Sequence, residues 1–141
     1  KDEIFDEIKI VLRVLNGKIS FDKSIFINNN IGLIEVSNSD LSLENDKLIL
    51  TSNLSIDIKN TDRLFSFLNT SKKSRKDIRN IKLNIAYDFL TKQIKIKNIK
   101  INDNDVSSQF NNIAEGFIDN NSNNLTKSRK LLNELINLYP G

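Results

Sequence analysis

One stretch decides the fold class of this chain: Leu48-Ile49-Leu50-Thr51-Ser52-Asn53-Leu54-Ser55-Ile56-Asp57-Ile58. Its large apolar residues stand at the even positions Leu48, Leu50, Leu54, Ile56 and Ile58, and polar residues fill most of the odd positions. Only Ile49 and Ser52 depart from this alternation. Because successive side chains of a strand point to opposite faces of a sheet, the pattern predicts a long strand with one apolar and one polar face.

Strand patterns also precede this stretch. From Ile8 to Leu15, apolar residues fill every even position and charged residues stand only at odd ones, which predicts a strand. Asn16-Gly17 then predicts a type I′ hairpin turn, since both central residues of that turn need a positive φ. Further short strands are predicted at Ile19-Ser20-Phe21, Ile25-Phe26-Ile27, Leu33-Ile34 and Leu41-Ser42-Leu43, and Asn45-Asp46 predicts the turn into the long strand.

A second hairpin is predicted after the long strand. Ile81, Leu83, Ile85 and Tyr87 alternate with Lys82, Asn84 and Ala86, and after a turn near 88–92, Ile94 and Ile96 alternate with Lys95 and Lys97. The alternation changes phase at Asn98, because the next apolar residues, Ile99 and Ile101, are odd-numbered. One extra residue would restore the faces, so we expect a β-bulge at Asn98.

Three helices complete the pattern. Asn60 or Thr61 is placed to cap a short helix near 61–69, and Asp105 a second helix. The apolar stripe of the second helix is Val106, Phe110, Ile113, Ala114 and Phe117, and a polar connector spans 120–124. A last helix is expected from Leu125 to Tyr139, with Leu131, Leu132, Leu135, Ile136 and Tyr139 on one side.

This order of elements predicts an α+β fold: an antiparallel, twisted β-meander sheet with a short inserted helix and two C-terminal helices. We expect a single β-rich domain over 1–141, with the sheet and short helix in 1–103 and the two helices in 105–139. The chain contains no Met, so we expect it to be a fragment of a longer protein.

The amino-acid composition excludes several kinds of metal site and catalytic site. The chain has neither Cys nor His, which excludes disulfides, the common zinc and copper sites, and Ser-His-Asp or Cys-His nucleophiles. We therefore expect no metal, no cofactor and no enzymatic activity. No apolar run reaches the ~18 residues of a membrane-spanning helix. The net charge is only +3.

The apolar strand face must be shielded from water. Roughly fifteen large aliphatic side chains line it, and burying each is worth about 1.5–3 kcal/mol. The net stability of a folded domain is only about 5–15 kcal/mol. Leaving the whole apolar face exposed to water would therefore cost more free energy than the domain has in net stability. The candidates for its cover are the helices of the chain, a second sheet, another part of the parent protein, or an apolar ligand such as a lipid tail.

The densest basic run lies after the short helix and contains Lys72, Lys73, Arg75 and Lys76. It is placed to contact phosphate, as in lipid head groups, but a solvated loop explains it as well. Lys82, Lys95, Lys97 and Lys100 extend the positive charge along the second hairpin, yet few aromatic residues stand among them. Nucleic-acid binding is therefore not expected, because single-strand binders usually stack bases on aromatic rings.

Two acidic clusters are candidate sites. An EF-hand loop beginning at Asp103 would need Gly at its sixth position and Glu at its twelfth, where the chain has Ser108 and Ala114. We therefore interpret Asp105 as a helix cap. The N-terminal cluster Asp2, Glu3, Asp6 and Glu7 contains paired carboxylates of the kind glycosidases use, but a solvated chain end accounts for it.

The order of segments resembles the C-terminal region of AsmA-like proteins. The resemblance rests on Leu15-Asn16-Gly17-Lys18-Ile19-Ser20-Phe21, Leu64-Phe65-Ser66-Phe67-Leu68, the basic loop, the hairpin from Ile78 to Ile101, and Leu131-Leu132-Asn133-Glu134-Leu135. It implies an envelope protein of Gram-negative bacteria, anchored in the inner membrane and projecting into the periplasm as a β-trough with an apolar interior. Such proteins are implicated in phospholipid transport to the outer membrane and in outer-membrane assembly. Because we expect this chain to be a fragment, we expect the anchor and most of the trough to belong to other parts of the parent protein.

We therefore expect a non-enzymatic segment whose apolar face guides phospholipid acyl chains. The residues expected to line it are Ile8, Ile10, Leu12, Leu48, Leu50, Leu54, Ile56, Ile58, Ile81, Leu83, Ile85, Ile94 and Ile96. The alternative is a structural capping domain, whose helices seal the sheet and which binds the rest of the parent chain or another envelope protein. An enzyme would instead need a concave cluster of ionisable groups with shifted pKa values.

Overall fold

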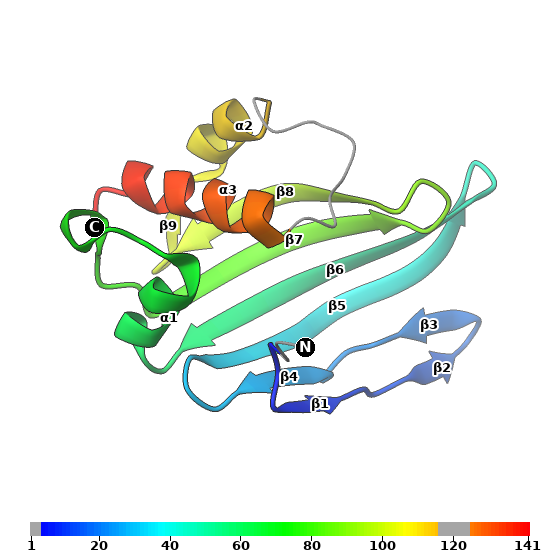
Figure 1. Cartoon of the computed structure of the whole chain (residues 1–141). Helices are drawn as coiled ribbons and strands as arrows, with labels where there is room; N and C mark the ends of the chain where they lie inside the picture. The colour runs from blue at the N-terminus through cyan, green and yellow to red at the C-terminus, as the bar shows by residue number, and fades with distance from the viewer. Residues whose placement is uncertain (1–3, 116–124) are drawn as a thin grey trace.

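The computed structural model describes residues 4–115 and 125–141. In these residues, one antiparallel sheet of nine strands is covered at one end by helices (Figure 1). The strands are β1 (Glu7–Lys9), β2 (Arg13–Leu15), β3 (Lys18–Ser20), β4 (Ile25–Asn28), β5 (Gly32–Glu44), β6 (Lys47–Ile58), β7 (Asn80–Asp88), β8 (Gln93–Ile101) and β9 (Asn104–Asp105). The helices are α1 (Thr61–Leu68), the 3-10 turn η1 (Lys72–Ser74), α2 (Ser107–Glu115) and α3 (Leu125–Leu138). The α+β fold predicted from the sequence is confirmed.

The sheet follows the order β1-β4-β5-β6-β7-β8-β9, with the β2–β3 hairpin joined to β5 through the pair Ile19–Leu41. The long strands β5, β6, β7 and β8 follow one another in sequence as neighbouring antiparallel strands. Their register aligns Val36 with Leu54, and Leu54 with Leu83. The apolar face therefore runs continuously across the four long strands.

Two strand predictions are corrected. The stretch from Ile8 to Leu15 is not one strand but two, β1 and β2, because the backbone of Val11 bonds to a side chain. Its N–H donates to Ser24 Oγ at 2.9 Å, and Ser24 Oγ lies 3.3 Å from its carbonyl. Leu33-Ile34 and Leu41-Ser42-Leu43 are not separate strands, because the residues between them also pair with β6 and complete the single strand β5.

The turn predictions are confirmed, and the predicted bulge of β8 is present one residue before Asn98. Asn16 and Gly17 have φ values of 51° and 74°, and Asn45 and Asp46 have 49° and 62°. In the β7–β8 pair, Asn84 is opposite Asn98 and Ile85 is opposite Ile96, which leaves Lys97 as the extra residue of the bulge. As a result, Ile99 and Ile101 return to the apolar face, where they are fully buried.

The helix caps are also as expected. Asn60 Oδ1 accepts the backbone N–H of Arg63 at 3.1 Å, and the C-cap of α1 is Asn69, which has a φ of 57°. Asp105 Oδ1 accepts the N–H of Ser107, the first residue of α2, at 2.8 Å. α3 ends at Leu138, one residue before the predicted end. Phe117 and the polar connector 120–124 lie outside the described residues.

The buried core lies under the helices. Phe65 and Leu68 of α1, Val106 and Phe110 beside β8, and residues of α3 close over one end of the sheet (Figure 1). The core comprises Phe65, Leu68, Ile78, Ile81, Ile99, Ile101, Val106, Phe110, Leu135, Ile136 and Tyr139. Among residues 4–115 and 125–141, the helices thus cover the apolar face at the end where β7 begins and β8 ends.

Candidate functional site

The thirteen residues predicted to line one continuous apolar surface fall into three groups. Under the helices, packed with the core, lie Ile56, Ile58, Ile81, Leu83 and Ile96. Around an open hollow lie Ile10, Leu50, Leu54 and Ile85. Exposed outside that hollow are Ile8, Leu12, Leu48 and Ile94. The helices thus cover less than half of the predicted lining.

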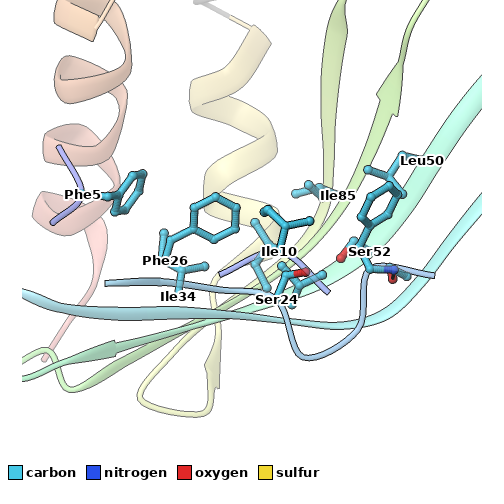
Figure 2. Close-up of a pocket in the computed structure, with 12 residues that line it drawn as sticks. Phe5, Ile10, Ser24, Phe26, Ile34, Leu50, Ser52 and Ile85 are labelled. Atoms are coloured by element: carbon cyan, nitrogen blue, oxygen red, sulfur yellow. Dashed lines mark hydrogen bonds between the residues drawn. The ribbon is translucent and has the colours of Figure 1, made fainter. Parts of the chain in front are cut away.

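The hollow, which we call the central groove, has a volume of about 360 Å³ (Figure 2). Its lining is Phe5, Ile10, Phe21, Ser24, Phe26, Ile34, Val36, Ser39, Leu50, Ser52, Leu54 and Ile85. The floor comes from β5, β6 and β7, and the wall comes from the N-terminal segment and β4. In that wall the rings of Phe5 and Phe26 pack at a centroid distance of 5.4 Å. The groove therefore offers aliphatic and aromatic carbon on more than one side.

The central groove lies over a row of β-bulges and irregular backbone that crosses the sheet from strand to strand. Opposite Ser52 of β6, strand β5 contains one extra residue, between Ser37 and Asp40. Ser52 pairs with Ile85, and Ile85 pairs with Ile96 at the bulge of β8. The chain between β3 and β4 is also irregular, with Lys23 at a φ of 68°. Because bulges bend and twist strands, this row marks where the sheet curves beneath the groove.

Three small residues, Ser24, Ser39 and Ser52, are buried at this bend. Their hydroxyls bond to the protein: Ser39 Oγ accepts the N–H of Phe21 and donates to Asp22 Oδ1, both at 2.7 Å. Ser52 Oγ lies 3.2 Å from the carbonyl of Asn53. Since these hydroxyls are bonded, the serines create space in the groove without presenting polar atoms that need a ligand partner.

Asp22 is a charged residue that bonds directly to this bend. The backbone N–H of Ser39, and then its hydroxyl, hold the pKa of the Asp22 carboxyl below its usual value of 3.8. Hydrogen bonds from Ser20 and the charge of Arg13 act in the same direction. A carboxylate held ionised in this way joins the β5 bulge to the segment between β3 and β4.

Besides the three serines, five apolar groove residues were not among the predicted lining: Phe5, Phe21, Phe26, Ile34 and Val36. They lie in short or interrupted apolar runs, for which alternation gives no reliable face. Their position follows from register, since Phe26 pairs with Ile34, and Ile34 pairs with Ile56 of the long strand. The even numbering of Ile34 and Val36 within β5 is a signal that could have found them, had β5 been recognised as one strand.

The basic loop divides into two parts. Lys72 and Lys73 are exposed on η1. Arg75 lies over the ring of Phe65, and its Nε donates to the carbonyl of Thr70 at 3.3 Å. Lys76 Nζ donates to the carbonyl of Asn137 at 3.2 Å, at the C-terminus of α3. Arg75 and Lys76 thus have structural contacts, which leaves Lys72 and Lys73 as the part of the loop directed to solvent.

The ionisable groups with shifted pKa values lie at turns and caps. The N–H of Thr91 lowers the pKa of Asp88, the Lys82 ammonium lowers that of Asp103, and the hydroxyl of Ser107 lowers that of Asp105. Hydrogen bonds or ion pairs to the charged form explain each shift. In the described part of the chain, no three Asp or Glu residues are grouped as a metal site would require.

No family model, curated protein or solved structure matches this chain. Residues 4–115 and 125–141 include no helix with the length and apolar character needed to cross a bilayer.

Proposed function

We propose that this chain is a non-enzymatic lipid-binding segment, and that its central groove holds an acyl chain of a phospholipid. The observation that carries the proposal is the open apolar groove itself, whose lining consists of aliphatic and aromatic side chains and three hydroxyl-bonded serines. Its volume of about 360 Å³ falls within the range of about 300–1,000 Å³ typical of small-molecule pockets.

The chemistry of the groove suits a methylene chain. Each CH₂ group that leaves water gains about 0.8 kcal/mol, and this gain has no preferred direction. A groove lined by apolar side chains therefore holds an acyl chain without fixing its position along the groove. The physical mechanism that we propose is passive sliding, with no bond made or broken.

The parent protein that we propose is an AsmA-like envelope protein, anchored in the inner membrane and exposed to the periplasm. In that setting the groove contributes to phospholipid transport to the outer membrane or to outer-membrane assembly. Support comes from the segment order of the sequence and from the curved antiparallel sheet with an apolar inner face.

A second candidate is a structural cap, and the core under the helices favours it. Leu135, Ile136 and Tyr139 of the last segment belong to one buried cluster with Ile99 and Ile101 of β8. In this candidate, the helices seal one end of a longer sheet, and the segment binds another envelope protein without contacting lipid.

A bulky substitution that fills the central groove distinguishes the lipid-binding candidate from the capping candidate. Ser52 is buried in the groove, whereas Thr51, its neighbour in β6, lies on the other face of the sheet. We expect Ser52→Phe to fill the groove and to weaken binding of an anthroyloxy-labelled palmitate about tenfold or more. Thr51→Phe, the matched control, should leave the binding unchanged. Absence of saturable binding by the unmodified chain, or equal binding by both variants, would contradict the lipid proposal.

Crosslinking tests the groove in the parent protein. A photo-reactive residue at Leu54, in the groove, should capture phospholipid from Gram-negative cells. The same residue at Leu83, which packs against the core under the helices, should capture protein instead. If Leu54 also captures only protein, the capping candidate is the better one.

A further inference from the structure

Exposed apolar side chains concentrate at one end of the sheet. Twelve large hydrophobic residues are exposed in the described part of the chain, and seven of them lie in or beside three hairpin turns. The turns are 16–17 between β2 and β3, 45–46 between β5 and β6, and 89–92 between β7 and β8. Figure 1 shows the three turns at the end of the sheet away from the C-terminus. We call this region the turn end.

The apolar residues of the turn end are among the most exposed of the chain. Leu15 and Leu90 are each 72% exposed and Leu43 is 70% exposed. Val14, Leu48, Phe89 and Ile94 are exposed as well. Large apolar side chains at the tips of neighbouring hairpins form a patch that favours contact with another apolar phase.

The β7–β8 turn holds its apolar side chains in place. Asp88 Oδ1 accepts the N–H groups of Leu90 and Thr91 at 2.8 and 3.1 Å. The N–H of Phe89 donates to the carbonyl of Leu48 at 3.1 Å, and the Phe89 ring packs edge-on against Tyr87 at 4.8 Å. The tip therefore presents Phe89 and Leu90 without further ordering, which lowers the entropic cost of docking.

The charge around the turn end is positive. The basic residues of its strands and turns are Arg13, Lys18, Lys47, Lys92 and Lys95, against the acidic residues Glu44, Asp46 and Asp88. Asp88 is bonded to turn N–H groups and lies 3.8 Å from Lys47. This arrangement is complementary to an anionic bilayer: the apolar tip suits the hydrocarbon core, and the basic residues around it suit the negatively charged head groups.

The turn end is also continuous with the central groove. Leu50 lines the groove and pairs with Leu41 on one side and Tyr87 on the other. In the same row, Tyr87 pairs with Ile94, and one step further along this face Leu43 pairs with Leu48. An apolar path thus leads from the groove to the tips, while the opposite end of the face is covered by helices.

We propose that the turn end docks onto a phospholipid bilayer with anionic head groups, and that the groove opens toward that bilayer. Phe89 and Leu90 enter the interface, and the lysines contact the head groups. This inference rests on the proposed function, because it names the surface from which the groove takes its lipid. The docking itself depends on different residues from those that line the groove.

A single tryptophan reports docking, because the chain contains none. With Leu90→Trp, vesicles of phosphatidylcholine and phosphatidylglycerol should shift the emission to shorter wavelength, and brominated lipid should quench it. The control is Leu138→Trp, at an exposed site on the last residue of α3, away from the turn end. Absence of a shift in the first variant, or an equal shift in both, would overturn the proposal. A shift that depends on protein concentration without vesicles would overturn it in favour of a second copy of this chain.

Two further variants separate docking from groove binding. The exposed double variant Phe89→Ser, Leu90→Ser should sediment with the mixed vesicles about tenfold less, yet bind labelled palmitate as the unmodified chain does. Ser52→Phe should show the opposite behaviour, so failure of the groove does not imitate failure of docking. Unchanged vesicle binding by the double variant contradicts docking through the turn end. Equal binding to vesicles of phosphatidylcholine alone contradicts the anionic preference.

Discussion

The carboxylate of Asp22 accepts two hydrogen bonds from Ser39, one from its backbone N–H and one from its hydroxyl, each 2.7 Å long. Ser39 belongs to the bulge of β5, and Asp22 lies in the segment between β3 and β4. These two bonds therefore hold the bend of the sheet against the segment that carries Phe21 and Ser24, both of which line the groove.

This contact predicts a pH dependence of stability. The pKa of Asp22 is lower in the folded chain than its usual 3.8, so its contribution to stability is present above that value and is lost as the pH falls through the folded-state pKa. We expect Asp22→Asn to lower the free energy of unfolding at neutral pH by about 1–2 kcal/mol, and by less in acid. Urea unfolding at several pH values measures this. Asp46→Asn, in an exposed turn, controls for the loss of a carboxylate; equal behaviour of the two variants would contradict the prediction.

The position of Gly32 leaves no room for a larger side chain. It has a φ of +155°, and a Cβ atom built on it would lie 2.0 Å from the backbone oxygen of Asp57 in the neighbouring strand. We expect Gly32→Ala to destabilise the chain by about 2–4 kcal/mol, because it combines backbone strain with a clash against backbone. Gly17→Ala should cost only about 1 kcal/mol, since a Cβ there meets no atom within 4 Å and only the positive φ is unfavourable. Similar midpoints of thermal unfolding for the two variants would contradict this account.

Asn133 predicts how α3 is attached to α1. Its Nδ2 donates to the carbonyl of Leu68 at 2.5 Å, and its Oδ1 accepts the hydroxyl of the buried Thr70. Asn133→Ala leaves both groups without this partner, so we expect a loss of about 2 kcal/mol and faster amide exchange in α3. Asn137→Ala, an exposed position one turn later, should change stability by less than about 0.5 kcal/mol. Exchange in α3 that is equal in both variants would show that Asn133 does not anchor the helix.

The basic loop predicts a contrast between neighbouring lysines. Lys76 donates to the carbonyl of Asn137 at the C-terminus of α3, where a positive charge also interacts favourably with the helix dipole. Lys76→Ala should therefore cost about 0.5–1 kcal/mol in chemical denaturation. Lys73→Ala, on the exposed η1 turn, should have no measurable effect. A loss of stability at Lys73 as large as that at Lys76 would contradict the division of the loop.

Local patterns in the sequence predicted much of the fold. Alternation predicted β6, β7 and β8, and the Asn16-Gly17 and Asn45-Asp46 pairs predicted turns. The phase change predicted a bulge at Asn98, and the extra residue of the observed bulge is its neighbour Lys97. The prediction failed for Ile8–Leu15, because Val11 bonds to the side chain of Ser24, thirteen residues away. A contact of that kind leaves no periodic signal in the sequence.

By itself, the sequence determined that this chain forms a one-sided antiparallel sheet with helices at its C-terminal end, because alternation, turn residues and helix caps act over a few neighbouring residues. Only the tertiary structure decided which part of the apolar face is covered. That outcome depends on strand register, as in the alignment of Val36 with Leu54, and on the docking of α3 through Asn133 onto Leu68. Both join residues far apart in the chain, so packing in three dimensions places Ile81 and Leu83 under the helices and leaves Leu50 and Leu54 beside the groove.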